Sequence, residues 1–291
     1  MDADAHAVQT QPNGALSPVQ HRDCPLCGQD NNDQLELECS SGTWTVRECA
    51  TCGFVYLDKL AHADVYAEVA DAERRAALQP WMHKLSKLTR KRLNLFGRKS
   101  LPIMVEVWAK PGPVLDLACG DGTHLDDMSP AFTPYGVEPQ TLLAKAADQR
   151  FSIDGGACIN ASVLDGLTGL PDDGFAAVTA RSYLHREAQP LAVLRELNRV
   201  LVPGGVAIIK VPNYGSINRQ VMGRKWCGFR YPDHLNYFTP KSLKKMGEKA
   251  GFTAHYGLTY TLPTSDNMYV VFKKAGGART CYSSCRGGCS T

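Results

Sequence analysis

The sequence predicts an α/β protein whose central sheet is mostly parallel and covered by helices on both faces. Short apolar runs alternate with stretches of helical periodicity between residues 114 and 273. Residues 206–211 are apolar almost throughout, which is typical of a strand buried on both sides. A loop of small residues over 118–123 follows the first apolar run, as in the strand–loop–helix unit that opens a nucleotide-binding sheet.

Each expected element rests on a local pattern. Residues 114–117 and 135–137 are short runs next to an acid, and residues 175–180 form an apolar run typical of a central strand. Leucines at helical spacing predict a helix over 191–201, and a second helix is expected over 142–147. Residues 203–205, Pro-Gly-Gly, predict a turn. Further strands are expected over 158–163, 255–262 and 268–273.

The loop after the first strand indicates the ligand. Asp116 and Asp121 would repel the pyrophosphate of a dinucleotide, and Leu125 stands where the dinucleotide pattern has its third glycine. S-adenosylmethionine has an adenosine, no phosphate and two cationic groups, so acids suit it. Glu138 ends the next short strand, where a carboxylate can accept the ribose hydroxyls. Neither a glycine turn nor a surface glutamate indicates a particular ligand by itself, but the two at this spacing predict an S-adenosylmethionine site.

Two Cys-x-x-Cys-Gly segments predict a structural zinc centre. Cys24 and Cys27 form the first pair, and Cys49 and Cys52 form the second. Four thiolates make a closed tetrahedral site with no open position for a substrate, so the metal would be structural. Redox chemistry at one pair is the alternative, but it would not need the second pair.

The segment 22–58 is therefore expected to be a zinc ribbon. Apolar and polar residues alternate between the two cysteine pairs, which predicts short strands, and residues 54–57 are expected to dock on the main domain. So small a segment buries little surface, so metal binding would supply its folding energy. Cys39 lies off the pattern and is interpreted as a spare thiol. The alternating apolar residues are Leu35, Leu37, Trp44 and Val46.

The ends of the chain predict no membrane attachment. Residues 1–21 are polar without a charged-then-apolar leader, and no apolar run approaches the length of a membrane span. We expect a cytoplasmic protein with a disordered tail over 1–21. Residues 275–291 hold Cys281, Cys285 and Cys289 among glycines and hydroxyl residues. A second metal site, a redox tail and a modified peptide are alternatives there, but a disordered extension is expected.

The loop resembles motif I of class I S-adenosylmethionine-dependent methyltransferases, with Ala118 in place of the first glycine and Gly120 and Gly122 at the next two. Residues 199–205 with 211–213 resemble an Arg-Val-Leu-Lys-Pro-Gly-Gly…Pro-Asn segment of bacterial members. Residues 226–239 resemble a Trp…Pro-x-His-Leu-x-x-Phe block, which marks a subgroup that often carries an N-terminal zinc ribbon.

The resemblance covers roughly residues 22–274 and implies the domain organisation. Residues 109–274 would form a Rossmann-like class I methyltransferase domain with a mostly parallel seven-stranded sheet. The stretch 59–108 has helical spacing and would be a lid over cofactor and substrate. The lid carries a basic cluster over 84–99, interpreted as a solvated face or as an anion site. No aromatic residues of the RNA-stacking type are interleaved with this cluster.

Methyl transfer from a sulfonium is an in-line displacement, and a base that removes a proton from the acceptor assists it. His185, at the end of the fourth strand, and His234, in the insert before the last strand pair, are the candidate bases, although a lone histidine is more often structural. Tyr231 is a further candidate that would orient substrate. The candidate cofactor residues are Asp116, Ala118, Gly120, Asp121, Gly122, Glu138, Asp165 and Ser182.

The predicted function is methylation of a small molecule, which the resemblance extends to sugar-linked and other secondary metabolites. An rRNA methyltransferase with a zinc recognition module is one alternative, against which the four-cysteine pattern and the block at 226–239 weigh. A catalytically silent cofactor-binding protein is the other. It stays open because the subgroup usually has Glu-His where this chain has His185 and Arg186. No pattern selects methylation on oxygen, nitrogen or carbon.

Overall fold

A computed structural model describes residues 20–34, 36–42, 44–60, 101–256 and 262–276. The basic cluster, most of the predicted lid, the polar N-terminal tail and the cysteine-containing end of the chain lie outside these residues. None of the helices in the described ranges combines the length and the apolar character that crossing a bilayer requires.

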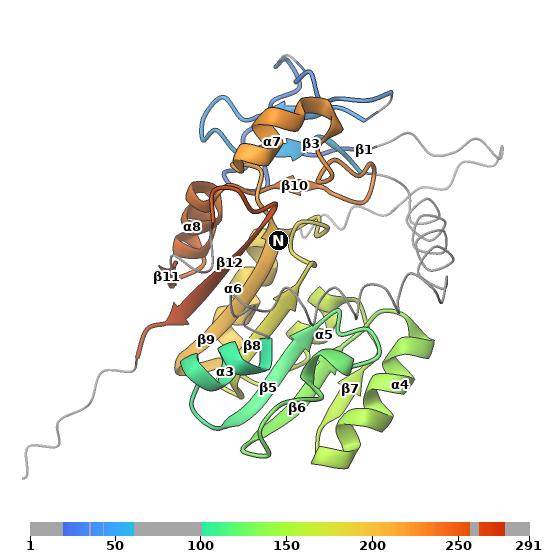
Figure 1. The fold of residues 1–291 in the computed structure, drawn as a ribbon, viewed down its shortest axis with the longest axis vertical. Helices are drawn as coiled ribbons and strands as arrows, with labels where there is room; N and C mark the ends of the chain where they lie inside the picture. Colours follow the sequence, from blue (N-terminus) through green and yellow to red (C-terminus); the bar gives the residue numbers. More distant parts are fainter. Residues whose placement is uncertain (1–19, 35, 43, 61–100, 257–261, 277–291) are drawn as a thin grey trace, which may run out of the picture.

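The central sheet has seven strands, and this confirms the predicted fold class (Figure 1). The strand order is β11-β12-β9-β8-β5-β6-β7. The five strands from β9 to β7 are parallel, whereas β12 runs antiparallel to both β9 and β11. The strands are β5 (Gly112–Leu117), β6 (Phe132–Val137), β7 (Ala157–Ile159), β8 (Phe175–Arg181), β9 (Leu201–Pro212), β11 (Phe252–His255) and β12 (Asn267–Lys274).

Helices cover both faces of this sheet, as the alternation of elements predicts. On one face α3 (Leu101–Trp108) packs its buried Met104 and Val105 against β5, β6 and β9. The other face is covered by α5 (Val163–Thr168), α6 (Pro190–Val200) and α8 (Pro240–Lys249). The leucine stripe predicted for 191–201 forms the buried side of α6. The remaining long helix, α4 (Thr141–Phe151), lies beside β6 and β7.

Three predicted elements differ from the observed ones. The strand expected over 158–163 stops at Ile159, because Ser162 caps the N-terminus of α5 by accepting the Asp165 N–H. The turn expected over 203–205 lies inside β9 as a bulge, since Phe175 pairs with Leu201 but Ala177 pairs with Val206. For the strand expected over 255–262, β11 ends at His255, where the expected strand begins, and residues 257–261 lie outside the described ones.

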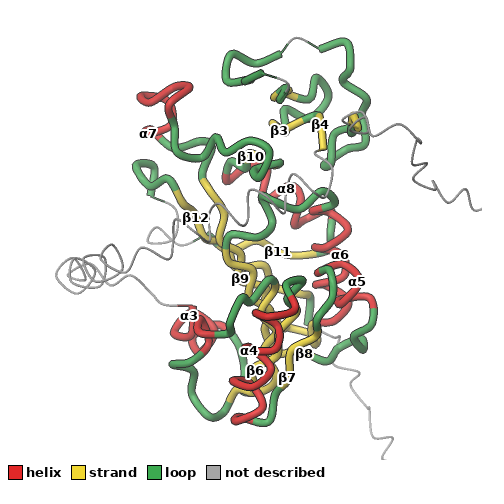
Figure 2. Tube along the Cα trace, turned by 90° about the vertical axis from the view of Figure 1, so that its right-hand side faces the viewer, coloured by secondary structure: helices red, strands yellow, loops and turns green. Residues whose placement is uncertain are grey.

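The N-terminal segment contributes to two small antiparallel sheets. In the first, β1 (Gln20–His21) pairs with β4 (Lys59–Leu60). The second consists of β2 (Val46–Glu48), β3 (Val55–Leu57) and β10 (Asn236–Tyr237), and β10 comes from the insert between β9 and α8. The predicted docking of residues 54–57 is thus achieved by strand pairing with the main domain. Figure 2 shows this segment and β10 together at one end of the molecule.

Candidate functional site

The loop after β5 turns through left-handed backbone at three positions. Ala118, Gly120 and Gly122 have φ values of 49°, 62° and 80°. A Cβ atom on Gly122 would lie 2.9 Å from the ring of Phe151, so only glycine fits there. A Cβ on Gly120 would meet no atom within 4 Å. The loop therefore packs tightly at Gly122 and leaves open space at Gly120, where a ligand can approach the backbone.

Glu138 lies beside this loop at the end of β6, and the residue is only 5% exposed. One carboxylate oxygen accepts the Gly120 N–H at 2.9 Å, and the other accepts the Gln140 N–H at 2.9 Å. Each oxygen keeps a second lone pair. The carboxylate is thus fixed in place and can still accept the two hydroxyls of a ribose, so these residues fit an adenosine-containing cofactor.

Asp116 lies in β5 opposite Thr179 of β8 and is almost fully buried. The Thr179 hydroxyl donates a hydrogen bond of 2.5 Å to its carboxylate. Burial outweighs this bond and raises the pKa of Asp116 to about 7. In Asp121 the balance is reversed: burial raises its pKa, but the hydrogen bonds from Thr123 more than offset that effect, so the pKa lies below its usual value.

The other two candidate cofactor residues lie at the start of α5 and just after β8. Asp165 is exposed in the first turn of α5, and its carboxylate accepts the Ser162 hydroxyl at 2.6 Å. Ser182 follows β8 with a φ of 57° and donates its N–H to the carbonyl of Lys210 in β9. Ser182 also lines the cavity that contains the two candidate bases.

The two histidines proposed separately as bases meet in the structure. The Nε2 atoms of His185 and His234 lie 3.1 Å apart, and the rings are nearly perpendicular, at 85°. His234 Nδ1 lies 2.7 Å from the carbonyl of Gly228, so that nitrogen carries the proton and donates. In a neutral His234 the Nε2 is then the acceptor, and His185 donates from its own Nε2. We assign the tautomers from this network.

This assignment leaves the Nδ1 of His185 as an acceptor. It is buried and has no hydrogen-bond partner among the described residues. Burial, followed by the effects of His234 and nearby cationic residues, lowers the pKa of His185 well below its ordinary value. The imidazole is therefore neutral at neutral pH, with a free lone pair. The backbone of His185 is held in place, because its carbonyl accepts the N–H groups of Leu235 and Asn236 at 2.8 and 2.9 Å.

A polar cavity of about 190 Å³ adjoins the histidine pair. Asp233, Arg186 and Asp266 line this cavity. From the sequence, Arg186 stands out only as a departure from the subgroup's Glu-His pair, and neither aspartate is predicted to be functional. Arg186 and Asp233 form an ion pair at 2.5 Å. Asp266 accepts the indole N–H of the buried Trp226 at 2.7 Å. Asp233 could have been suspected from its place beside His234 in the 226–239 block, but nothing local marks Asp266.

Tyr231 is oriented differently from the two histidines. Its hydroxyl donates to the backbone carbonyl of Cys39 in the N-terminal segment, and its ring stacks on Phe229 at 6.2 Å. It is not among the residues that line the cavity next to the histidines. In this structure Tyr231 therefore connects the insert with the cysteine-containing segment and does not face the cavity.

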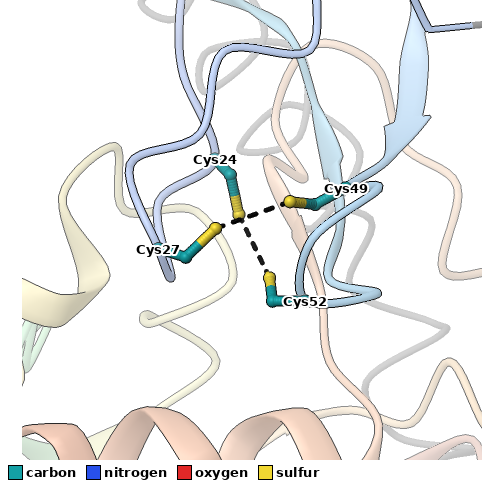
Figure 3. A group of neighbouring side chains, drawn as sticks. All are labelled: Cys24, Cys27, Cys49 and Cys52. Atoms are coloured by element: carbon teal, nitrogen blue, oxygen red, sulfur yellow. Dashed lines mark hydrogen bonds between the residues drawn. The ribbon is translucent and has the colours of Figure 1, made fainter.

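The four cysteines predicted to bind zinc converge at one point (Figure 3). Their sulfur atoms all lie within 4.8 Å of one another, and the Cys24–Cys52 and Cys27–Cys49 sulfur pairs are 3.5 Å apart. A tetrahedral zinc with Zn–S bonds of about 2.3 Å separates its sulfurs by roughly 3.8 Å. The cluster therefore has the donor atoms and nearly the spacing that a structural zinc needs.

Fold and site together define a class of enzyme. A mostly parallel seven-stranded sheet with an antiparallel β12, a glycine loop after β5 and an acid ending β6 define the class I S-adenosylmethionine-dependent methyltransferases. The chain belongs to the methyltransferase domain family, whose model matches residues 71–256. It is a methyltransferase that uses S-adenosylmethionine.

Solved structures with a similar fold include three archaeal and bacterial proteins. A SAM-dependent methyltransferase from Archaeoglobus fulgidus is 16% identical, with a TM-score of 0.46 over 65% of this chain and 94% of that one. A possible histamine N-methyltransferase from Thermotoga maritima is 17% identical, with a TM-score of 0.45 over 58% of this chain and 86% of that chain. A chain from a complex of the Haloferax volcanii Trm112 methyltransferase activator and a putative methyltransferase is 17% identical, with a TM-score of 0.44. The match covers 57% of this chain and 84% of that chain. No curated protein matches the sequence.

Proposed function

We propose that the protein transfers the methyl group of S-adenosylmethionine to a small molecule bound in the cavity beside His185 and His234. One observation carries this proposal: a neutral imidazole has a buried, unpartnered Nδ1 next to a polar cavity. A buried acceptor without a donor is costly. A substrate hydroxyl or amine would satisfy it and give up its proton there.

The cofactor would bind where the ends of β5 and β6 meet. Glu138 would accept the ribose hydroxyls with the lone pairs that Gly120 and Gln140 leave free. The open space at Gly120 would admit the cofactor, with Ala118 and Gly122 shaping the loop. Asp121, and Asp116 in its ionised form, would place negative charge near its cationic groups, and Asp165 and Ser182 would line its two ends. When bound, S-adenosylmethionine supplies an electrophilic methyl group.

In the proposed mechanism His185 is the general base and His234 is a positioning residue. The Nδ1 of His185 would take the proton that the acceptor group loses when it is methylated, with S-adenosylhomocysteine as the other product. His234 keeps His185 in the tautomer that leaves Nδ1 unprotonated, because the Nε2 of His234 accepts a hydrogen bond from the Nε2–H of His185. The Nδ1–H of His234 is in turn held by the Gly228 carbonyl. Positioned general bases contribute roughly 10²- to 10⁴-fold to rate, and the lowered pKa of His185 favours the lower end of this range. Alignment of the acceptor in the cavity supplies the rest.

The four-cysteine cluster would hold a structural zinc ion. Such a centre supplies folding free energy and takes no part in methyl transfer. Its role here would be to hold the segment that contains β2 and β3 against β10, next to His234. The buried ion pair between Arg47 and Asp58, at 2.6 Å, stabilises the same segment.

The dimensions and polarity of the cavity favour a small polar acceptor. About 190 Å³ suffices for a compact molecule or for one group of a larger molecule. The acid and base side chains that line it can bind hydroxyl, amine or carboxylate groups. An RNA base would also need stacking and phosphate contacts, and the basic cluster that could supply them lies outside the described residues.

The test is release of S-adenosylhomocysteine by purified, zinc-loaded protein against a metabolite library, with a pool of structured RNA as a parallel arm. Turnover with a metabolite is expected, and His185→Gln should lower it by about 10²-fold or more while keeping cofactor affinity. Turnover only with RNA, weakening steeply as salt rises, would support the rRNA alternative instead. Cofactor binding without turnover in either arm would support the catalytically silent alternative.

A further inference from the structure

Two thiols outside the zinc cluster lie in contact beside the cofactor loop. Cys119 stands between Ala118 and Gly120, and Cys158 lies in β7. Their sulfur atoms are 3.6 Å apart. Cys119 is buried, whereas Cys158 is partly exposed.

The path between the two thiols depends on a glycine in the intervening strand. Gly136 of β6 pairs in register with Cys158, and a Cβ at this position would lie 2.6 Å from the sulfur of Cys119. Any larger residue at Gly136 would push the Cys119 side chain away. β6, the strand between β5 and β7, therefore has no side chain at the position where the two thiols are in contact.

We propose that Cys119 and Cys158 are an oxidisable pair, which a peroxide converts to a disulfide that weakens cofactor binding. The second half of this statement rests on the proposed role of the loop 118–122. The reagent class is a two-electron oxidant, with hydrogen peroxide as the simplest member.

The chemistry has two balanced steps. The Cys158 thiolate attacks one peroxide oxygen and breaks the O–O bond, which yields a sulfenic acid and, after protonation, one water. The Cys119 sulfur then attacks the Cys158 sulfur, the S–O bond breaks, and a second water leaves with the thiol proton. Two thiols are oxidised by two electrons, and one peroxide is reduced to two waters.

The environment assigns the two thiols to these steps. The hydrogen bond from Cys119 holds the pKa of Cys158 below its usual value, and the same bond together with burial raises the pKa of Cys119. Cys158 is thus both the more accessible thiol and the first to ionise, as an attacking thiol must be. Cys119 is the buried partner that closes the disulfide.

The disulfide would act on the loop through the chain neighbours of Cys119. Bond formation brings the sulfurs from 3.6 Å to about 2.0 Å. Cys119 precedes Gly120, whose N–H holds the Glu138 carboxylate at 2.9 Å. It follows Ala118, which already has a strained φ of 49°. Pulling Cys119 toward β7 therefore displaces the groups that would contact the ribose.

The experiment uses the full-length, zinc-loaded protein and S-adenosylhomocysteine as the calorimetric probe. Affinity is measured for reduced protein, after hydrogen peroxide, and after dithiothreitol, and free thiols are blocked before peptide mapping. We expect a Cys119–Cys158 disulfide, an affinity about tenfold lower, and recovery on reduction. Cys158→Ser should bind the probe normally and lose the sensitivity to peroxide. Cys39→Ser removes a partly buried thiol elsewhere and should keep that sensitivity.

Three results overturn the inference, and each has a distinct cause. If peroxide oxidises other thiols but forms no Cys119–Cys158 disulfide, the two residues are not an oxidisable pair. A mapped disulfide with unchanged affinity disproves its effect on the loop. An equal loss of affinity in Cys158→Ser attributes the effect to the zinc cluster. Reduced protein that fails to bind the probe before any oxidant is added disproves the proposed cofactor site itself, a failure that is separate from the other three.

Discussion

The guanidinium group of Arg22 donates a hydrogen bond of 2.6 Å to the side-chain oxygen of Asn236. Arg22 lies just before the first cysteine pair, and Asn236 lies in β10. The Asn236 amide group donates in turn to the carbonyls of Leu184 and Glu187, on either side of His185. One asparagine side chain therefore links the cysteine-containing segment to the backbone that holds the proposed base.

Arg22→Ala should lower turnover more than cofactor affinity. The substitution removes hydrogen bonds to Asn236 and to the carbonyls of Leu235 and Ala188, so we expect a loss of about 1–3 kcal/mol in the free energy of unfolding. Urea unfolding, calorimetry and turnover measure the three quantities. Arg195→Ala, at an exposed position of α6, is the matched control and should change none of them. A fall in cofactor affinity equal to the fall in turnover would contradict the positional role.

Glu138→Gln should weaken S-adenosylmethionine binding by about tenfold or more, because an amide nitrogen cannot accept the Gly120 N–H or a ribose hydroxyl. Glu138→Ala should abolish detectable binding. Titration calorimetry measures both. Glu106→Gln, at an exposed position of α3, serves as the control. Unchanged affinity in Glu138→Ala would remove the ribose assignment.

Asp116 should make the protein less stable as the pH rises from about 4 to about 7. Its pKa is about 7 in the folded state and about 3.9 in an unfolded chain, so the native state binds the extra proton in this window. Each pKa unit corresponds to about 1.4 kcal/mol, so the expected loss is on the order of a few kcal/mol. Urea unfolding of the apoprotein at several pH values should show a flatter profile in Asp116→Asn. Parallel profiles for the two proteins would contradict the raised pKa.

Ala118→Gly should leave the free energy of unfolding unchanged or raise it by up to about 1 kcal/mol. Alanine is strained at a φ of 49°, and glycine relieves this strain while adding entropy to the unfolded chain. Ala180→Gly, in the ordinary strand backbone of β8, should lower stability instead. Chemical unfolding of the two variants separates the effects, and an equal loss in both would show that the loop is not strained.

Removal of metal should destabilise the insert as well as the cysteine segment. With the proposed zinc in the four-cysteine cluster, chelation would release thiolates that lie within 4.8 Å of one another, and β3, which pairs with β10, would lose its anchor. Hydrogen exchange should therefore rise at Asn236 and Tyr237 together with residues 46–57, and zinc should reverse it. A rise confined to residues 46–57 would show that β10 stays ordered without the cysteine centre.

Elements with strong local signals could be predicted from the sequence. The continuous apolar run in β9 and the leucine stripe of α6 show their burial directly, and the cysteine spacing predicted a cluster that the structure brings together. Boundaries were less accurate where a cap decides them, as at Ser162, since one side-chain hydrogen bond ended the expected strand.

Contacts between distant polar residues could not be predicted. His185 and His234 were each proposed as bases, but they lie 49 positions apart, and only the folded insert places their rings side by side. A strand of two residues such as β10 has no periodicity to detect, so its pairing with β3 was not foreseen. Asp266 and Arg22 likewise act through partners that no local pattern identifies.

The pairing of β10 with β3 constrains the order in which the protein can fold during synthesis. The four-cysteine cluster and β3 leave the ribosome before β10, and this third strand of their sheet follows only after most of the methyltransferase domain has been made. Until then the edge of β3 that later pairs with β10 remains open to solvent or to other chains. The cysteine-containing segment therefore emerges well before the strand that completes its sheet.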